Sequence, residues 1–418
     1  MARPSTSAEI SCFLHRLATN YPHVTLLTLG HSVSGQPLHA LLLPAAGRAF
    51  AMPDDPHRPI TFFFLATQHG MEPAGGEALL AIAADLAAQP DPHAQFILMP
   101  NMNPDGRDRH RRVNARGVNL STDFLALSQP ETHACVEILR RFRPHVLLDI
   151  HESAALKKHS LGAQGFLLDF EAQFEPANNP NVHRALRALA FRKLLPDVLA
   201  RVARTGLPAQ RYIGEITSTN QILTHGGLSL RNVRNFAGIM GTCAFLLENR
   251  LDPSTGTYPT PRNIQLRVLK QISCIRAFTD TCRAHERAIR KATYLARRAW
   301  DTPTVGHRIW LASRYLPASP HAVRNVPLIR ISDGARVFLP FRYHRMIAPA
   351  NPVSLPTTYL IPPQHPLVPL LRRHNFRLEP TSTGMLCIPT QQPGGLLLPL
   401  LLEPVRETPV SNNTGGRY

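Results

Sequence analysis

One stretch, residues 60–86, constrains the fold of this chain more than any other. It opens with an apolar, aromatic run over 60–66, bounded by a polar turn, which predicts a buried strand. The apolar-rich segment 75–86 that follows predicts a helix. His69 and Glu72 lie in the turn between them. Strand ends of this kind are where α/β proteins keep their functional sites, so these two side chains are the first candidates for chemistry.

A histidine and a carboxylate three residues apart in a tight turn can bind one cation together. A catalytic zinc ion is held by imidazole nitrogen and carboxylate oxygen atoms, usually from three protein ligands, with water in the remaining position. His151 is the candidate third ligand because it follows a second strand-like run, 146–150. Asp149 is placed to orient a ligand by a hydrogen bond. The spacing alone fits a metal site and a pair of structural histidines about equally well.

Composition narrows the class of protein. At 418 residues, with 44% hydrophobic and 18% charged residues, the chain is expected to be globular and to hold two domains. The net charge of +18 comes from Lys and Arg spread along the chain, without a zinc-finger or RNA-binding signature. No nucleic-acid partner is therefore expected, although attraction to anionic substrates stays open.

The chain shows neither a membrane span nor a targeting segment. Its longest apolar run, 396–402, is too short to cross a bilayer. The N-terminus lacks the pattern of a signal peptide, so we expect a cytoplasmic protein, or an exported one if the start is mis-assigned. The six cysteines form no CxxC pair and suit free thiols in a reducing compartment. The oligomeric state is not indicated.

Hydrophobic patterning predicts the remaining elements and a division near residue 300. Residues 152–180 look irregular, and proline becomes frequent after Trp300, where short strand-like runs replace helical patterns. We expect a catalytic domain over 1–300 and a small β-rich or mixed C-terminal module over 305–418. The predicted helices are 8–20, 129–142, 182–204 and 263–299, and the predicted strands are 24–30, 38–44, 96–100, 208–216 and 242–247.

Five short motifs follow one another between residues 20 and 290. They are His69-Gly70-Met71-Glu72, Asn103-Pro104-Asp105-Gly106, Arg112-Val113-Asn114-Ala115-Arg116-Gly117-Val118-Asn119-Leu120, Asp149-Ile150-His151 and Phe245-Leu246-Leu247-Glu248. Their types and order resemble those of the zinc metallocarboxypeptidases, peptidase family M14. The resemblance implies a three-layer α/β/α fold with a mixed, mostly parallel central sheet.

The resemblance also implies a role for each matching residue. His69, Glu72 and His151 would bind one Zn²⁺ per chain. Glu248 would act as general base toward zinc-bound water and then as general acid toward the leaving amine. Arg112 would stabilise the oxyanion, although the neighbouring Arg109 and Arg111 are alternatives. For Glu248 the alternative is a structural ion pair with Arg250.

The chain departs from the family pattern where substrate is held. Family members usually follow the third motif with Asn-Arg, which clamps the terminal carboxylate of the substrate, whereas this chain has Ser121 and Thr122. Either no free carboxylate is needed, as in an amidase, deacylase or endopeptidase, or another arginine such as Arg231 or Arg234 replaces the clamp. The candidate substrate contacts are Asn114, Ser121 and Arg231. A tyrosine that assists the leaving group has no clear counterpart, and Tyr212 and Tyr258 are guesses.

The leading hypothesis is a zinc metallocarboxypeptidase that acts on a peptide or an N-acyl amino acid. The first alternative is a deacylase of the aspartoacylase or succinylglutamate desuccinylase type, which shares the His-x-x-Glu turn and the later His. The second is a catalytically reduced binding protein of the same fold, suggested by Ser121 and Thr122 but opposed by the retained Glu248. A basic nucleic-acid binder comes last.

Overall fold

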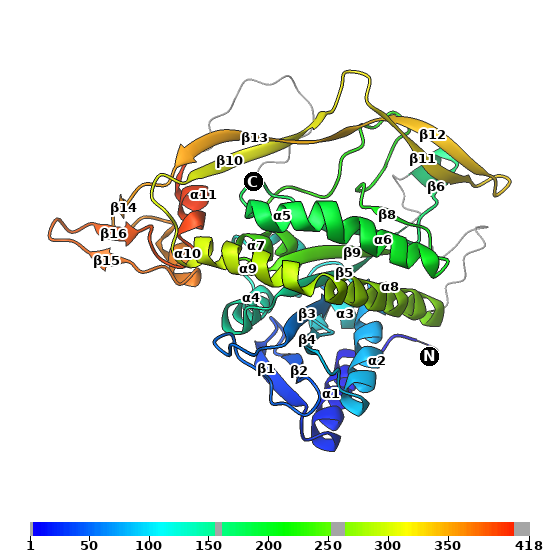
Figure 1. Ribbon diagram of the computed structural model, residues 1–418, viewed down its shortest axis with the longest axis horizontal. Coiled ribbons are helices and arrows are strands. Elements are labelled where there is room, and N and C mark those ends of the chain that lie inside the picture. Colours follow the sequence, from blue (N-terminus) through cyan, green and yellow to red (C-terminus); the bar gives the residue numbers. More distant parts are fainter. Residues whose placement is uncertain (1–2, 155–160, 252–263, 405–418) are drawn as a thin grey trace.

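The computed structural model describes residues 3–154, 161–251 and 264–404, and Figure 1 shows its layout. Its centre is an eight-stranded sheet with the order β1-β2-β4-β3-β5-β9-β7-β8. The inner strands β4, β3, β5 and β9 run parallel, whereas β2 and β7 join them antiparallel. The sheet strands are β1 (Thr25–His31), β2 (Pro37–Leu43), β3 (Ile60–Ala66), β4 (Ala94–Met99), β5 (Val146–Ala154), β7 (Ala172–Pro176), β8 (Ala209–Arg211) and β9 (Cys243–Leu251).

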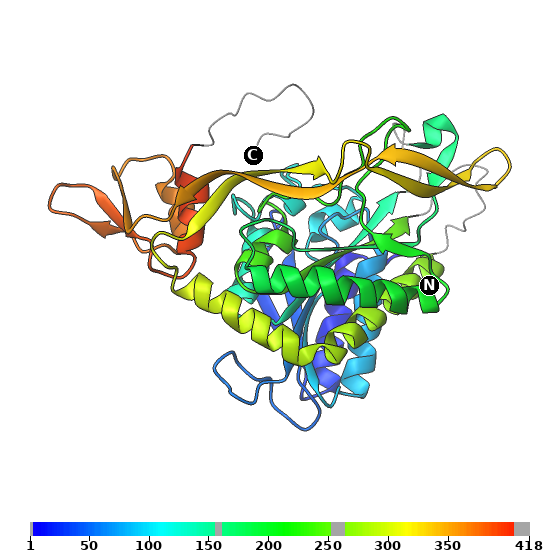
Figure 2. The ribbon, with the colours of Figure 1, turned by 45° about the horizontal axis from the view of Figure 1, so that its top comes forward.

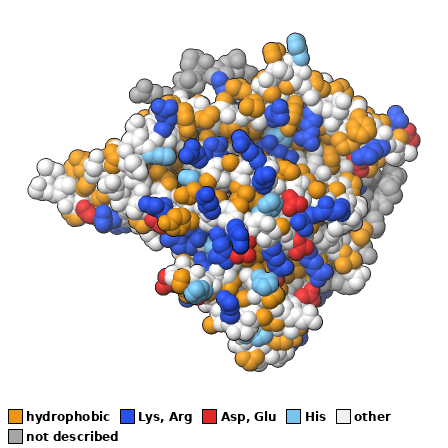
Figure 3. Space-filling view, in the orientation of Figure 1, with side chains coloured by type: hydrophobic (Ala, Val, Ile, Leu, Met, Phe, Trp, Pro, Cys, Tyr) orange, Lys and Arg blue, Asp and Glu red, His pale blue; other side chains and the backbone are white. Residues whose placement is uncertain are grey.

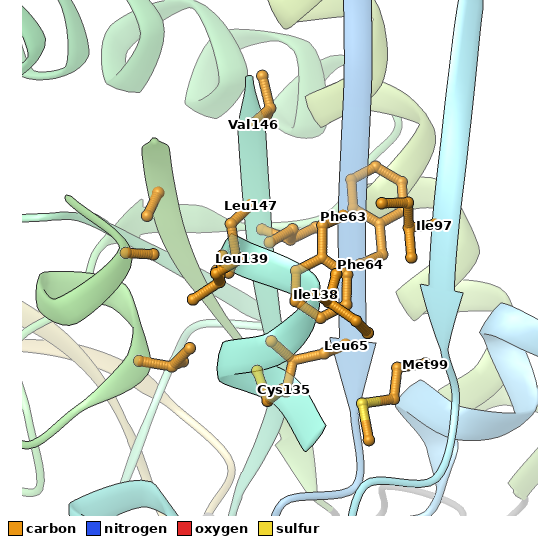
Figure 4. Packing of buried hydrophobic residues seen from close by; sticks show 14 of the residues in the cluster. Phe63, Phe64, Leu65, Ile97, Met99, Cys135, Ile138, Leu139, Val146 and Leu147 are labelled. Carbon is orange, nitrogen blue, oxygen red and sulfur yellow. The ribbon is translucent and has the colours of Figure 1, made fainter. Parts of the chain in front are cut away.

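Helices cover both faces of this sheet, which confirms the predicted three-layer fold. Phe278 of α8 packs against Phe64, Phe174 and Phe245 from three different strands, with ring centroids 5.2 to 6.4 Å apart. Successive residues of a strand point to opposite faces, so Leu65 points away from α8. Figure 4 shows it clustered with buried residues of α4. The core is therefore filled from both sides by alternating residues of the same strands.

The part of the chain before β10 (Arg308–Pro317) holds all the predicted site residues and is called the catalytic part; its helices mostly follow the prediction. The structure has α1 (Ser7–Asn20), α2 (Ala74–Ala88), α3 (Pro104–Asp108), α4 (Pro130–Phe142), α5 (Arg184–Leu189), α6 (Leu195–Arg204), α7 (Val233–Ile239), α8 (Ile264–Ala284) and α9 (Glu286–Asp301). A π-helical turn, Ala190–Leu194, joins α5 to α6, so residues 184–204 form one continuous rod.

Three predictions about the elements were wrong. The single helix expected over 263–299 is two helices, which meet at His285. The stretch 152–180, expected to be irregular, contains β6 (Phe166–Leu168) and β7, which pairs with β9 inside the central sheet. The strand expected over 208–216 is only the short β8. Strand formation depends on the partner strand as well as on local sequence. The hydrophobic pattern therefore did not predict β7, which contains polar residues.

The C-terminal part is mainly β, as expected. A long ribbon of β10 (Arg308–Pro317) and β13 (His344–Ser354) arches over the catalytic part in Figures 1 and 2. At one end β11 (Val323–Arg330) pairs with β12 (Arg336–Arg342) and with β6. At the other end lie β14 (Thr358–Ile361), α10 (Val368–Arg373), β15 (Glu379–Pro380), β16 (Leu386–Pro389) and α11 (Leu398–Leu402).

The surface and the cysteines agree with the composition. Lys and Arg side chains gather on the face shown in Figure 3. The π-helical turn between α5 and α6 carries exposed Arg192 and Lys193, and α9 carries exposed Arg287, Lys291 and Arg298. All six cysteines are free thiols, and four of them are buried. Within the described ranges, no helix combines the length and the apolar character needed to cross a membrane.

The packing of Phe278 predicts a large loss of stability on truncation. Phe278→Ala should lower the free energy of unfolding by about 3–5 kcal/mol, because it leaves a cavity against three strands. Urea denaturation monitored by circular dichroism measures the change. Leu269→Ala is the matched control on the same helix, since Leu269 is 61% exposed and its loss should cost little. Equal effects of the two substitutions would contradict this account of the core.

Candidate metal centre and active site

The site lies where β3, β5 and β9 end. His69 and Glu72 occupy the turn after β3, His151 is on β5, and Glu248 is on β9 directly opposite His151 in the sheet register. Because these strands are parallel neighbours, their carboxyl ends meet at one edge of the sheet. The structure therefore brings together three predicted metal ligands and the predicted general base.

The turn that carries His69 is held by a second turn. Asn103 donates from Nδ2 to the Gln68 carbonyl at 3.0 Å and accepts from the Gly106 amide at 2.9 Å. A Cβ atom on Gly70 would lie 1.9 Å from the carbonyl carbon of Gly106, so the two backbones approach each other too closely for any side chain. The glycines of the first two motifs are thus a packing requirement, and Asn103 links the motifs.

Glu72 bridges the two histidines. Its Oε1 lies 2.8 Å from Nδ1 of His69 and its Oε2 lies 2.9 Å from Nδ1 of His151. The two Nδ1 atoms are 3.2 Å apart. All three side chains are at least nine-tenths buried and offer ligand atoms within 4.8 Å of one another. This group could hold a metal ion.

The donor set fits zinc in type and spacing. Tetrahedral Zn²⁺ with Zn–N distances of about 2.0–2.1 Å separates its ligand atoms by about 3.3 Å, close to the observed distance between the two imidazole nitrogens. Two ring nitrogens at this distance, both directed at one carboxylate, are arranged as ligands of a shared cation.

The remaining ring nitrogens are fixed by polar neighbours. Nε2 of His151 lies 2.9 Å from Oδ1 of Asp149, as predicted, and the same oxygen accepts from Nε2 of Gln68. Nε2 of His69 lies 3.1 Å from both Asn119 Oδ1 and Ser121 Oγ. These contacts leave each Nδ1 free to face Glu72, which is the arrangement that orients metal-binding histidines. Gln68 and Asn119 were missed by the sequence analysis, although Asn119 lies inside the third motif and Gln68 directly precedes the first.

Burial and neighbouring charges shift the pKa values of the three candidate metal ligands. Burial lowers the pKa of His69. Burial opposes the charged form of His151, but Asp149 and Glu72 raise its pKa well above the usual range. Burial would raise the pKa of Glu72, but His69 and His151 hold it below its ordinary value. Glu72 is therefore an anion under all ordinary conditions, as a metal ligand must be.

Glu248 has a different environment. Its side chain is half-buried, and its Oε2 is shielded from water with no hydrogen-bond partner among the described residues. Burial, reinforced by the negative charges of Glu72 and Asp149, raises the pKa of this carboxyl to about 8 although His151 opposes the shift. A carboxyl with a pKa near neutrality can both accept and donate a proton.

The predicted arginine and substrate residues lie around this centre. Arg112 is half exposed, and its Nη1 lies 3.4 Å from Oε1 of Glu72. Ser121 lies next to His69, and the Nε of Arg231 donates to the Thr122 carbonyl at 3.0 Å. Asn114 points elsewhere: its amide donates to Gln129 and Glu131, and its oxygen accepts from its own turn. Tyr258 lies outside the described residues.

Comparison with known proteins agrees with this geometry. The model of the zinc carboxypeptidase family, peptidase M14, matches residues 10–270. Carboxypeptidase 2 of Trichophyton rubrum is 25% identical over 383 residues, which are 87% of this chain and 67% of that protein. Probable carboxypeptidase 2 of Trichophyton verrucosum is 27% identical over 312 residues, 71% of this chain and 57% of that protein. The chain thus spans between about half and two thirds of the length of these relatives.

A shorter sequence match and a solved structure are also similar to this chain. Carboxypeptidase D of Rattus norvegicus is 36% identical over 151 residues, 31% of this chain and 11% of that protein. The solved structure of a metallo-carboxypeptidase from Burkholderia cenocepacia has a TM-score of 0.51 and 17% identity, covering 67% of this chain and 70% of that one, which shows the shared fold.

Fold and site together define a hydrolase of the metallocarboxypeptidase type. The chain belongs to the zinc carboxypeptidase family, peptidase M14. The alternatives of a deacylase from another group, a binding protein and a nucleic-acid binder are not favoured by these findings.

The pairing of Asp149 with His151 yields a prediction about metal affinity. Asp149→Asn keeps the shape of the side chain but removes the charge that orients the imidazole, so the affinity for Zn²⁺ should fall about 10- to 100-fold. Competition with a chromophoric chelator measures it. Asp85→Asn is the control, because Asp85 is exposed and pairs only with Arg276. Unchanged affinity in Asp149→Asn would contradict the orienting role.

Proposed function

We propose that this chain is a zinc-dependent carboxypeptidase that releases the C-terminal residue of a peptide. The observation that supports the proposal is the buried His69–Glu72–His151 group with Glu248 beside it at one sheet edge. When bound there, Zn²⁺ supplies Lewis-acid chemistry: it makes water acidic enough to act at neutral pH and polarises a carbonyl group. One ion per chain is expected, since one group of three ligands is present in the described ranges.

Glu248 moves the proton in the proposed reaction. It lies opposite His151 with a free, buried Oε2, so a water molecule between them can hand its proton to this oxygen. The same carboxyl then donates the proton to the nitrogen of the leaving amine, which completes hydrolysis of the amide bond without net consumption of a proton.

Arg112 is proposed to stabilise the oxyanion. Its guanidinium reaches Glu72 yet stays half exposed, so part of it remains available to a substrate carbonyl at the metal. A fixed positive charge at that place favours the transition state over the ground state, because negative charge develops on the carbonyl oxygen only during attack. For Arg109 and Arg111 the structure records no hydrogen bond or ion pair of the side chain with the site residues, which favours Arg112 among the three.

Arg231 is proposed to bind the terminal carboxylate of the substrate. It comes from the segment before α7, and its bond to the Thr122 carbonyl brings a guanidinium to the turn where relatives usually carry an arginine of their own. Ser121 adds a hydroxyl close to His69. An N-acyl amino acid ends in the same carboxylate and is the second candidate substrate. Asn114 is proposed to shape the loop that carries Arg112, since its own groups are occupied.

Loss of the general base should abolish turnover but not metal binding. Glu248→Gln should lower kcat by at least about 10²- to 10⁴-fold, because an amide cannot take the proton. Zinc content, measured by mass spectrometry of the purified protein, should stay near one per chain. Glu379→Gln, on the exposed strand β15, is the control and should keep full activity. Undiminished turnover by Glu248→Gln would rule out this mechanism.

The carboxylate role of Arg231 predicts how the enzyme treats blocked substrates. Wild type should hydrolyse peptides with a free C-terminus and leave the C-terminally amidated forms nearly untouched. Arg231→Gln should raise KM for the free acids by about 10-fold or more, since a charge-assisted bond is lost. The control Arg109→Gln should leave KM for the free acids unchanged. Equal hydrolysis of acid and amide by wild type would instead point to an amidase.

A further inference from the structure

The C-terminal arm, defined as the β10–β13 ribbon, is joined to the catalytic part near both of its ends. Near the start of β10, Asn181 exchanges two hydrogen bonds with the backbone of Trp310, each of 2.8 Å. Beyond the far end, β11 pairs with β6, and a small separate core forms there from both parts of the chain. The members of that core are Leu161, Ile213, Ile216, Leu223, Val326, Leu328 and Phe341. The arm is therefore held at two points with its middle stretched over the catalytic part (Figure 2).

Two tyrosines, Tyr315 on β10 and Tyr343 directly before β13, bind one turn of the catalytic part. The hydroxyl of Tyr315 donates to the Gly226 carbonyl at 2.8 Å and accepts from Nδ2 of Asn178 at 3.0 Å. The hydroxyl of Tyr343 lies 2.6 Å from Nε2 of His225. Neighbouring backbone bonds join Leu223 to the same stretch of the arm.

His225 connects Tyr343 to Tyr212 through its two ring nitrogens. Its Nδ1 lies 2.7 Å from the Tyr212 carbonyl, which can only accept, so Nδ1 donates there and Nε2 accepts from Tyr343. Burial and the nearby Arg211 lower the pKa of His225 to about 3, so the ring stays neutral and keeps this tautomer. The arm, the turn and Tyr212 thus form one hydrogen-bonded chain.

Tyr212 and the turn lie next to the catalytic strands. The Tyr212 amide donates to the Phe174 carbonyl on β7 at 2.9 Å, and the adjacent residue of β7, Gln173, pairs with Glu248 in the sheet. Burial, followed by the charge of Glu248, raises the pKa of the Tyr212 phenol. Tyr212 therefore lies beside the strand pair that carries the general base, and the turn at His225 is bonded to Tyr212.

The underside of the turn is equally well held. Arg234 of α7 is 4% exposed and donates from Nη2 to the Gly227 carbonyl and to Asn178 Oδ1. A Cβ atom on Gly226 would lie 2.8 Å from Nη1 of Arg234, so the turn rests directly on the guanidinium. With Arg234 below and the tyrosines above, the turn has one defined position.

We infer that the C-terminal arm is part of the catalytic unit, in which Tyr315 and Tyr343 act as positioning residues that fix segment 212–228 as the wall of the substrate cleft beside Glu248. The inference rests on the proposed function, because it assigns the cleft wall of that same site. The tyrosines act through the turn and not on the reacting atoms, so they should affect the binding of substrate more than the chemical step.

Point variants test this better than truncation, since Leu311, Leu355 and Leu398 of the C-terminal part belong to the main core. Tyr315→Phe and Tyr343→Phe each remove one hydroxyl. Each should raise KM for a short free-acid peptide about three- to tenfold, and the double variant more, with kcat within about twofold of wild type. Zinc content should not change.

Tyr359→Phe is the matched control. Its hydroxyl bonds Glu403 within the C-terminal part, away from the turn, so its loss should leave KM unchanged. The melting temperatures of all three single variants should fall by similar small amounts. If KM of the Tyr315 and Tyr343 variants stays at the wild-type value while only the melting temperature falls, the tyrosines merely stabilise the fold and the inference is wrong.

A second readout separates this inference from the proposed function. Amide hydrogen exchange over residues 212–228 should be faster in Tyr343→Phe than in wild type or Tyr359→Phe, whatever the substrate is. A wild-type enzyme that cleaves no peptide but shows this local change would overturn the function and keep the arm's positioning role. Unchanged exchange in that segment would overturn the arm's role even if the peptidase activity is confirmed.

Discussion

One carboxylate, Glu72, holds the site together. It faces the Nδ1 atoms of His69 and His151 at the same time, and both rings are turned toward it by contacts on their other nitrogens. A buried anion between two imidazoles is stable only if positive charge is close by, which protonated histidines or a bound cation can supply. The distances fit Zn²⁺. The positive charge that buried Glu72 needs can therefore be the same ion that supplies the chemistry of the site.

The rest of the catalytic part serves to present these groups. Parallel pairing of β3, β5 and β9 places three strand ends side by side, and the close approach of Gly70 to Gly106 makes the first two motifs one structural unit. Phe278 and its neighbours fix the strands from one face, and α4 covers the other. Fold stability and site geometry therefore depend on the same contacts.

The site is not built from the first 300 residues alone. The turn at His225 and Gly226 contacts the arm above it and Arg234 below it, and it leads to Tyr212 near Glu248. Residues of the C-terminal part also enter the main core. The change in composition near residue 300 predicts a catalytic domain and an accessory module. The contacts between these two parts, however, join them into one structural unit.

Most strands and helices and the candidate metal ligands were predictable from the sequence, because local hydrophobic patterns and fixed residue spacings indicate them. The apolar runs of β3, β4, β5 and β9, the amphipathic helices and the ligand spacing in His69-Gly70-Met71-Glu72 all needed only neighbouring residues. Tertiary structure alone decided the rest. It paired the polar β7 with β9, occupied Asn114 with Gln129 and Glu131, brought Arg231 to Thr122, and joined Tyr343 to His225 across 118 residues. Such contacts depend on where distant segments meet in space, and no local period or spacing encodes that.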